Sequence, residues 1–146
     1  MYMPGTFHAI YMLLLNAAGQ NLHAIDTGSN PYISVLSIIC RTLRPFDDDQ
    51  KIPAYGFGDV SSRDHSLFSF APGDQPIHTF ENVLARYKSF VGRVQMSGPT
   101  TFAPAIYQAV KKVQEDGRYH ILVIVCDGQV SCCVIGTICK ATGFNE

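Results

Sequence analysis

The chain has no Lys, Arg, Asp or Glu before Asp26, and only 16% of its 146 residues are charged, against about 25% in an average globular protein. No apolar run approaches the roughly 18 residues that span a bilayer, which predicts no membrane insertion. Eleven basic and 12 acidic residues give a net charge of −1, without the basic footprint of a nucleic-acid binder. The 47% of hydrophobic residues and the length instead fit a single folded domain.

The uncharged N-terminus also lacks the positive segment of a secretory signal peptide, although residues 9–15 are apolar and Ala17-Ala18-Gly19 could be cleaved. The chain has no pair of cysteines at zinc-finger spacing, and its five cysteines are an odd number, at positions 40, 126, 132, 133 and 139. We therefore expect reduced thiols and a cytoplasmic or nuclear protein.

Hydrophobic periodicity predicts three helices and three strands. The order along the chain is helix, strand, strand, helix, helix, strand, at residues 31–43, 52–57, 66–70, 80–91, 104–116 and 119–126. Five consecutive branched apolar residues make the last strand a central one, covered on both faces. The second strand is expected near an edge. The order indicates an α/β domain of three layers.

Capping residues and apolar stripes define the predicted helices. Ser29-Asn30-Pro31 and Thr79 stand where helices begin, and Gly117 ends the third. The expected inward faces are Tyr32, Val35, Leu36, Ile39 and Leu43; Phe80, Val83, Leu84, Tyr87 and Val91; and Ile106, Ala109, Val110 and Val113.

The candidate site lies where strands end, because ligands of open α/β sheets bind beyond the carboxyl ends of the strands. Asp59 and Asp127 each follow a predicted strand. The hydroxyl of Thr100 and the carboxylate of Asp127 could share one magnesium ion, which prefers oxygen ligands. Each also has an ordinary structural explanation, since Thr often caps a helix and Asp-Gly often forms a turn.

Several segments together resemble the copine-type von Willebrand factor A domain, in the form found in plant RING-domain ubiquitin ligases and plant copines. They include NPYISVLSIICRTL, GFGD, SLFSFAPGDQPIHTFENVLARYKSFV, GPT-x-F-x-P and VIV-x-DGQV, in that order. The resemblance implies a Rossmann-like, mainly parallel sheet with helices on both faces. It divides the chain into an atypical N-terminal segment at 1–21, a partial domain at 22–130 and a divergent tail at 131–146.

The resemblance also implies a metal-ion-dependent adhesion site, in which a magnesium ion accepts a carboxylate from a partner protein. Thr100 and Asp127 match two of its three loops. The D-x-S-x-S loop is missing, because residues 26–30 have the wrong spacing and Asp59 to Arg63 lacks the final Ser. Two ligands leave magnesium mostly hydrated. We therefore predict weak or absent magnesium binding.

The family's opening strand and closing elements are not recognisable in this sequence. Losing a central strand would leave its neighbours with unpaired backbone groups. The N-terminal AIYMLLL is the candidate to replace that strand, and residues 132–139 could add another. The position of residues 1–20 therefore decides whether the layered domain is closed.

The implied function is a protein-interaction module, linked to ubiquitination through RING-containing relatives. The chain carries no Cys/His series of a RING domain, so ubiquitin transfer is not expected of this polypeptide. Its oligomeric state is left open.

Two alternatives remain at this point. Asp26 begins a D-T-G-S sequence like that of aspartic proteases. Those enzymes use two facing carboxylates, so a homodimer would be needed to supply the second one. The chain could also be a remnant without independent function.

His120 is expected to be a satisfied buried side chain rather than a catalyst.

Overall fold

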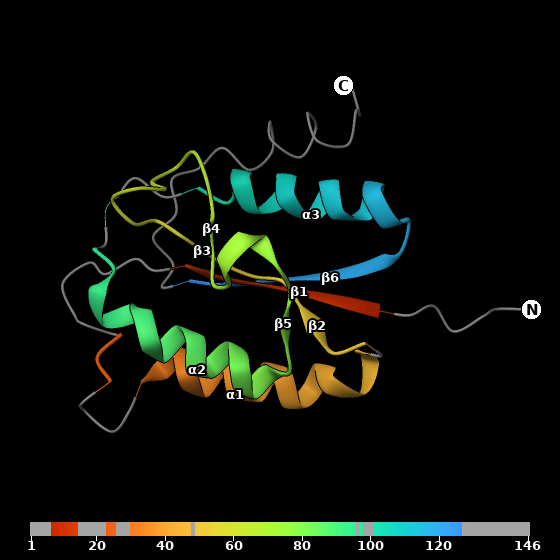
Figure 1. The fold of residues 1–146 in the computed structure, drawn as a ribbon, viewed down its shortest axis with the longest axis horizontal. Coiled ribbons are helices and arrows are strands. Elements are labelled where there is room, and N and C mark those ends of the chain that lie inside the picture. The colour runs from red at the N-terminus through yellow and green to blue at the C-terminus, as the bar shows by residue number, and fades with distance from the viewer. Residues whose placement is uncertain are drawn as a thin grey trace, which may run out of the picture.

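The computed structural model describes residues 7–14, 23–25, 30–47, 49–95, 97 and 101–126 (Figure 1). Within these ranges it contains a four-stranded sheet, a two-stranded sheet and three α-helices. None of the described helices is long and apolar enough to cross a membrane.

The N-terminal strand β1 (Phe7–Leu14) occupies the middle of the larger sheet. It pairs in parallel with β3 (Ala54–Phe57) on one side and with β6 (Tyr119–Val125) on the other. β4 (Phe68–Ser69) adds to β3 in the antiparallel direction, giving the order β4-β3-β1-β6. The expectation that the N-terminal segment replaces the missing strand is confirmed, and the backbone groups of β3 and β6 that face it are paired.

The predicted strand at 52–57 is split in two by Pro53, which has no N–H for a strand ladder. The first part, β2 (Lys51–Ile52), pairs antiparallel with β5 (Ile77–His78) in the smaller sheet. The second part is β3, which remains in the larger sheet. The predicted second strand is confirmed at the edge as β4, shortened to two residues.

Helices cover both faces of the larger sheet (Figure 1). α1 (Pro31–Leu43) and α2 (Phe80–Phe90) lie on one face, and α3 (Ala103–Asp116) lies on the other. Short 3-10 turns follow or separate these elements at Arg44–Phe46, Pro72–Asp74 and Val91–Arg93.

Alternate side chains of β3 and β6 enter two separate hydrophobic cores. Ala54 and Val123 pack with α1 and α2, whereas Tyr55 and Leu122 pack with α3. This alternation with a period of two residues is the geometry of a strand covered on both sides. The predicted three-layer, mainly parallel α/β fold is therefore confirmed.

Four details of the sequence prediction need correction. Among the described strands β6 ends the order rather than lying in the centre, a place that β1 takes. Val35 and Val113 are 39% and 41% exposed. The buried residues of α1 are Tyr32, Leu36 and Cys40, and those of α3 are Ala105 and Ala109, so Val113 lies one turn beyond the last of them. Thr79 precedes α2 but its side chain makes no capping hydrogen bond.

The other cap predictions hold. The side chain of Asn30 accepts a hydrogen bond from the Ile33 amide at 3.0 Å, and Pro31 opens α1. Gly117 ends α3 in the left-handed conformation, with φ of +64°. Local capping chemistry therefore sets the bounds of these two helices.

Candidate functional site

The carboxyl ends of three parallel strands meet at one edge of the sheet. The last residue of β1, Leu14, is level with the last residue of β3, Phe57. Leu13 is level with Val125, the last residue of β6. Helix α3 begins at the same edge, where the rings of Phe57 and Phe102 meet edge to face at 6.2 Å. We call this the carboxyl edge.

A hydrogen-bonded turn follows β3 at the carboxyl edge. The carboxylate of Asp59 accepts hydrogen bonds from the Ser62 amide at 2.7 Å and from the Ser61 hydroxyl at 2.6 Å, and also from the Ser62 hydroxyl. The Arg63 amide donates to the Asp59 carbonyl at 2.8 Å. An Asp side chain that binds the backbone ahead of it is a typical way to close a turn.

The same hydrogen bonds control the charge of Asp59. Partial burial raises the pKa of the carboxyl, but the hydrogen bonds from Ser61 and Ser62 outweigh burial and lower the pKa below its ordinary value of 3.8. Donors to a carboxylate stabilise its ionised form. Asp59 is therefore a fixed negative charge at neutral pH, with much of its hydrogen-bonding capacity already used.

The predicted site residues Thr100 and Asp127 lie outside the described residues, as does Asp26 of the protease alternative. The nearest described residues are at the carboxyl edge. Phe102 and Cys126 pack against one hydrophobic cluster, which also contains Phe57. The pairing of Thr100 with Asp127 stays a prediction.

The described residues do not fit a complete magnesium site. Within the part of the chain that the structure describes, no three His, Cys, Asp or Glu side chains gather into a group that could hold a metal ion. β1 takes the central place in the sheet, yet residues 15–25, which follow it, contain no Asp, Glu or Ser. Residues 26–30, which come next, include an Asp and a Ser, but their spacing does not fit a D-x-S-x-S loop.

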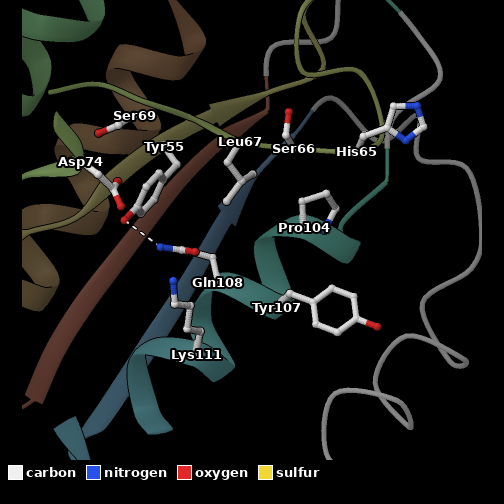
Figure 2. Close-up of a pocket in the computed structure, with 10 residues that line it drawn as sticks. All are labelled: Tyr55, His65, Ser66, Leu67, Ser69, Asp74, Pro104, Tyr107, Gln108 and Lys111. Atoms are coloured by element: carbon white, nitrogen blue, oxygen red, sulfur yellow. Dashed lines mark hydrogen bonds between the residues drawn. The ribbon is translucent and has the colours of Figure 1, made fainter. Parts of the chain in front are cut away.

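A hollow of about 470 Å³ lies between β4 and α3 (Figure 2). The Gln108 amide donates a hydrogen bond to the Tyr55 hydroxyl across it at 3.1 Å. Burial is the main cause that raises the pKa of Tyr55 to about 12, and the neighbouring carboxylate of Asp74 adds to it. The hollow combines a protonated phenol, an amide and the opposite charges of Asp74 and Lys111, so it suits polar side chains of a partner.

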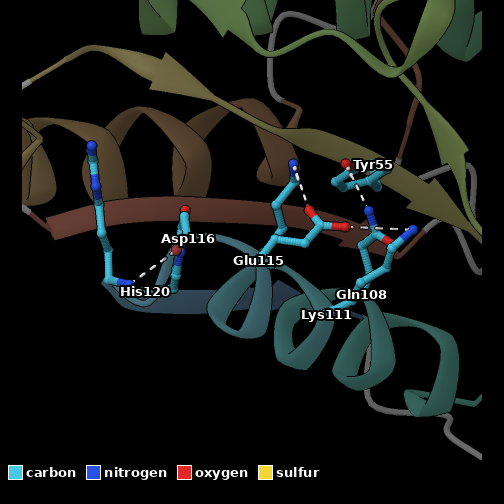
Figure 3. Close-up of polar contacts among 8 residues, drawn as sticks. Tyr55, Gln108, Lys111, Glu115, Asp116 and His120 are labelled. Atoms are coloured by element: carbon cyan, nitrogen blue, oxygen red, sulfur yellow. Dashed lines mark hydrogen bonds and ion pairs between the residues drawn. The ribbon is translucent and has the colours of Figure 1, made fainter.

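His120 lies at the opposite end of the sheet from the carboxyl edge, near the start of β6 (Figure 3). Its side chain is almost fully buried, and its Nε2 atom is 2.9 Å from Asp116 Oδ1 at the end of α3. The prediction of a buried, hydrogen-bonded histidine is confirmed for its Nε2 atom. Lys111 and Lys112 flank Glu115 at 3.8 and 3.5 Å on the surface of α3, as a solvated face would.

Sequence reasoning missed a buried polar cluster beneath α1 and α2. His23 Nδ1 lies 2.7 Å from the Tyr87 hydroxyl, and the His23 ring stacks on Tyr32 at 4.1 Å. Asn30, which caps α1, donates to the same hydroxyl at 3.5 Å. His23 and Tyr87 are 64 residues apart, and no local pattern connects them. The only sequence signal was a tyrosine on each apolar stripe.

Comparison with known proteins gives consistent matches. The sequence profile described as Copine matches residues 21–143. The chain is 48% identical to the E3 ubiquitin-protein ligase RGLG3 of Arabidopsis thaliana over 113 residues, which are 77% of this chain and 31% of that protein. It is 48% identical to RGLG2 of the same plant, over 77% of this chain and 24% of that protein. It is 46% identical to copine family protein 2 of Caenorhabditis elegans, over 75% of this chain and 2% of that protein. The chain thus spans less than a third of the length of these relatives.

Proposed function

Because this chain belongs to the copine family, we propose that it is a protein-interaction module that binds a partner protein at the carboxyl edge. The observation that carries the proposal is that the parallel strands β3, β1 and β6 end at the same edge of the sheet. Such an edge is where open α/β sheets bind their ligands. The ordered Asp59 turn and the entry to α3 provide polar groups there.

The names of the relatives extend the proposal to ubiquitination. RGLG3 and RGLG2 are E3 ubiquitin-protein ligases. We propose that this module, in a protein of that kind, holds the protein to be ubiquitinated while another region performs the transfer. A cytoplasmic or nuclear location also remains a proposal, and the free thiol of Cys126 agrees with it.

Magnesium is proposed to bind weakly or not at all. The wrong spacing of residues 26–30 for a D-x-S-x-S loop supports this, because an ion held only by Thr100 and Asp127 would keep most of its water. Isothermal titration of the chain with magnesium chloride is expected to give no micromolar binding. A micromolar dissociation constant that is lost in the Asp127→Asn variant would contradict the proposal.

Photo-crosslinking tests the proposed binding edge directly. A benzoylphenylalanine replaces exposed Val60 at the carboxyl edge in one variant and exposed Tyr119, at the start of β6, in the matched control. Illumination in extract of the source cells is expected to give a discrete protein adduct at position 60 and none at 119. Equal adducts at both positions, or none at 60, would contradict binding at this edge.

A further inference from the structure

A second groove, on the opposite side of β4 from the hollow of Figure 2, has chemistry that the copine assignment does not explain. It measures about 520 Å³ and lies between β4 and the C-terminal part of α2, with the Asp59 turn at its margin. Ser69 lines both hollows, so β4 forms the rim between them. We call it the β4–α2 groove.

Three aromatic rings make the groove partly apolar. Phe70 and Phe90 meet edge to face at 4.6 Å, and Phe68 meets Phe90 in the same way at 5.8 Å. Phe70 is buried, whereas Phe68 and Phe90 are half-buried and accessible from the groove. The Phe68 ring lies over Gly56, in the space that a Cβ atom there would occupy. The glycine therefore gives the tip of the ring room to approach the backbone of β3.

Two arginines flank this apolar surface. Arg86 and Arg93 are seven residues apart on α2 and the turn after it, both are exposed and both line the groove. Seven residues correspond to two turns, or about 10 Å. Arg93 Nη2 donates to the Ser89 carbonyl at 2.9 Å, which orients its guanidinium.

The groove carries a net positive charge. Arg86 and Arg93 line it together with one carboxylate, that of Asp59. Among the described residues, no acidic side chain pairs with Arg86. Asp59 stays ionised, but its oxygens already accept hydrogen bonds from Ser61 and Ser62. Two cations against one anion leave the groove with a charge of +1, although the chain as a whole has a net charge of −1.

We propose that the β4–α2 groove binds an extended acidic peptide of the partner protein. Two carboxylates would pair with Arg86 and Arg93, and an apolar side chain between them would cover Phe68 and Phe90. An extended chain advances about 3.3 Å per residue and its side chains alternate between two faces, so the two acidic residues stand four positions apart with the apolar residue midway between them, all three facing the groove. Arginine is suited to this task because its fork of donors matches a carboxylate. The inference rests on the proposed function and adds the chemistry of the partner.

Fluorescence anisotropy with a synthetic peptide tests the inference. The probe is a labelled dodecapeptide with the core glutamate–serine–phenylalanine–serine–glutamate; the control peptides carry glutamines in place of both glutamates or serine in place of phenylalanine. The full chain is expected to bind the probe at least about tenfold more tightly than either control. Binding is also expected to weaken as salt is raised.

Charge reversal assigns the binding to this groove. The Arg86→Glu/Arg93→Glu variant is expected to lose at least about tenfold in affinity for the probe. The Arg41→Glu/Lys88→Glu variant makes the same change in net charge at exposed residues that do not line the groove, and it is expected to bind as the unmodified chain does. Thermal melting checks that both variants are folded.

Two results would overturn the inference: failure of the folded chain to bind the probe, or equal loss of binding in the two variants. The crosslink from position 60 separates this failure from that of the proposed function. If the crosslink forms but the acidic peptide does not bind, the module still has a partner and the groove assignment is wrong. If neither is seen, both are wrong.

Discussion

At the scale of single residues, Tyr87 connects parts of the chain that are far apart in sequence. Its side chain is fully buried, and its hydroxyl contacts His23 at 2.7 Å and Asn30 at 3.5 Å. Burial raises the pKa of Tyr87 to about 12, although the hydrogen bond from Asn30 opposes this. A buried hydroxyl that shares its partners with a helix cap couples the packing of α2 to the start of α1.

Tyr87→Phe is expected to lower the free energy of unfolding by about 1–3 kcal/mol, because the polar atoms of His23 and Asn30 lose a buried partner. Urea titration at pH 7 measures this. The unmodified chain should also lose stability as pH rises from about 10 to about 12, since the unfolded tyrosine ionises from 10.0 and the folded one only near 12. The variant should lose less over that range. Tyr119→Phe, which alters a side chain in a residue that is 73% exposed, is the control.

Asp59 predicts a second effect, at acid pH. Its folded pKa lies below 3.8, so the stability it provides is complete above about pH 5 and is lost as pH falls through the lowered value. Asp59→Asn should lower the free energy of unfolding by about 1 kcal/mol at pH 7. The variant should also lose less stability than the unmodified chain as the pH falls below about 5. Unfolding of the exposed Glu81→Gln control should follow the unmodified chain. If Asp59→Asn and the unmodified chain lost unfolding free energy equally at acid pH, the stability of the turn would not depend on the charge of Asp59.

At the scale of elements, β3 and β4 depend on one close contact. Gly56 in β3 faces Phe68 in β4, and the aromatic ring fills the space of a missing Cβ atom. The ring in turn contacts Phe70 and Phe90. The two-residue strand β4 is therefore held by side-chain packing more than by its short ladder of hydrogen bonds.

Gly56→Ala is expected to destabilise the fold by about 1–3 kcal/mol, because the Phe68 ring must leave its place over β3. Gly92→Ala is the matched control, since a Cβ atom there meets nothing within 4 Å. Urea midpoints of the two variants check the difference. A Gly56→Ala midpoint equal to that of Gly92→Ala would mean that the ring moves without cost.

The elements also show what the sequence could predict. Asn30-Pro31 and Gly117 marked helix ends correctly, because caps act through neighbouring backbone groups. The break at Pro53 could be predicted from the same local chemistry, because proline has no N–H for a strand ladder. The contact of His23 with Tyr87 could not be predicted, because only the packing of α1 against α2 brings the two residues together.

The site was less predictable than the fold. Strand ends pointed to Asp59, but its engagement by Ser61 and Ser62 depends on the conformation of the turn. The two grooves beside β4 escaped notice because each is lined by residues from several elements. Arg86 and Arg93 read in sequence as ordinary exposed positions of a helix.

At the scale of the whole molecule, the domain depends on β1. Both neighbours of this strand are parallel partners, so it closes the sheet that separates the two cores. Such a strand needs its amide hydrogens, which alternate between the two neighbours.

Tyr11→Pro tests that dependence, because proline removes a ladder hydrogen bond from a strand with neighbours on both sides. We expect a large loss of unfolding free energy, seen as the loss of cooperative thermal melting. Tyr11→Ala keeps the amide and serves as the control for removal of the side chain. Equal melting of the two variants would count against a paired position for residue 11.

The most direct test of the account is amide hydrogen exchange across residues 7–14 in the full chain. If β1 lies between β3 and β6, its amides should exchange as slowly as those of residues 121–125 and should lose protection only when the domain unfolds. Exchange of residues 7–14 at the rate of an unstructured peptide, while residues 54–57 and 121–125 stay protected, would contradict the central position of β1.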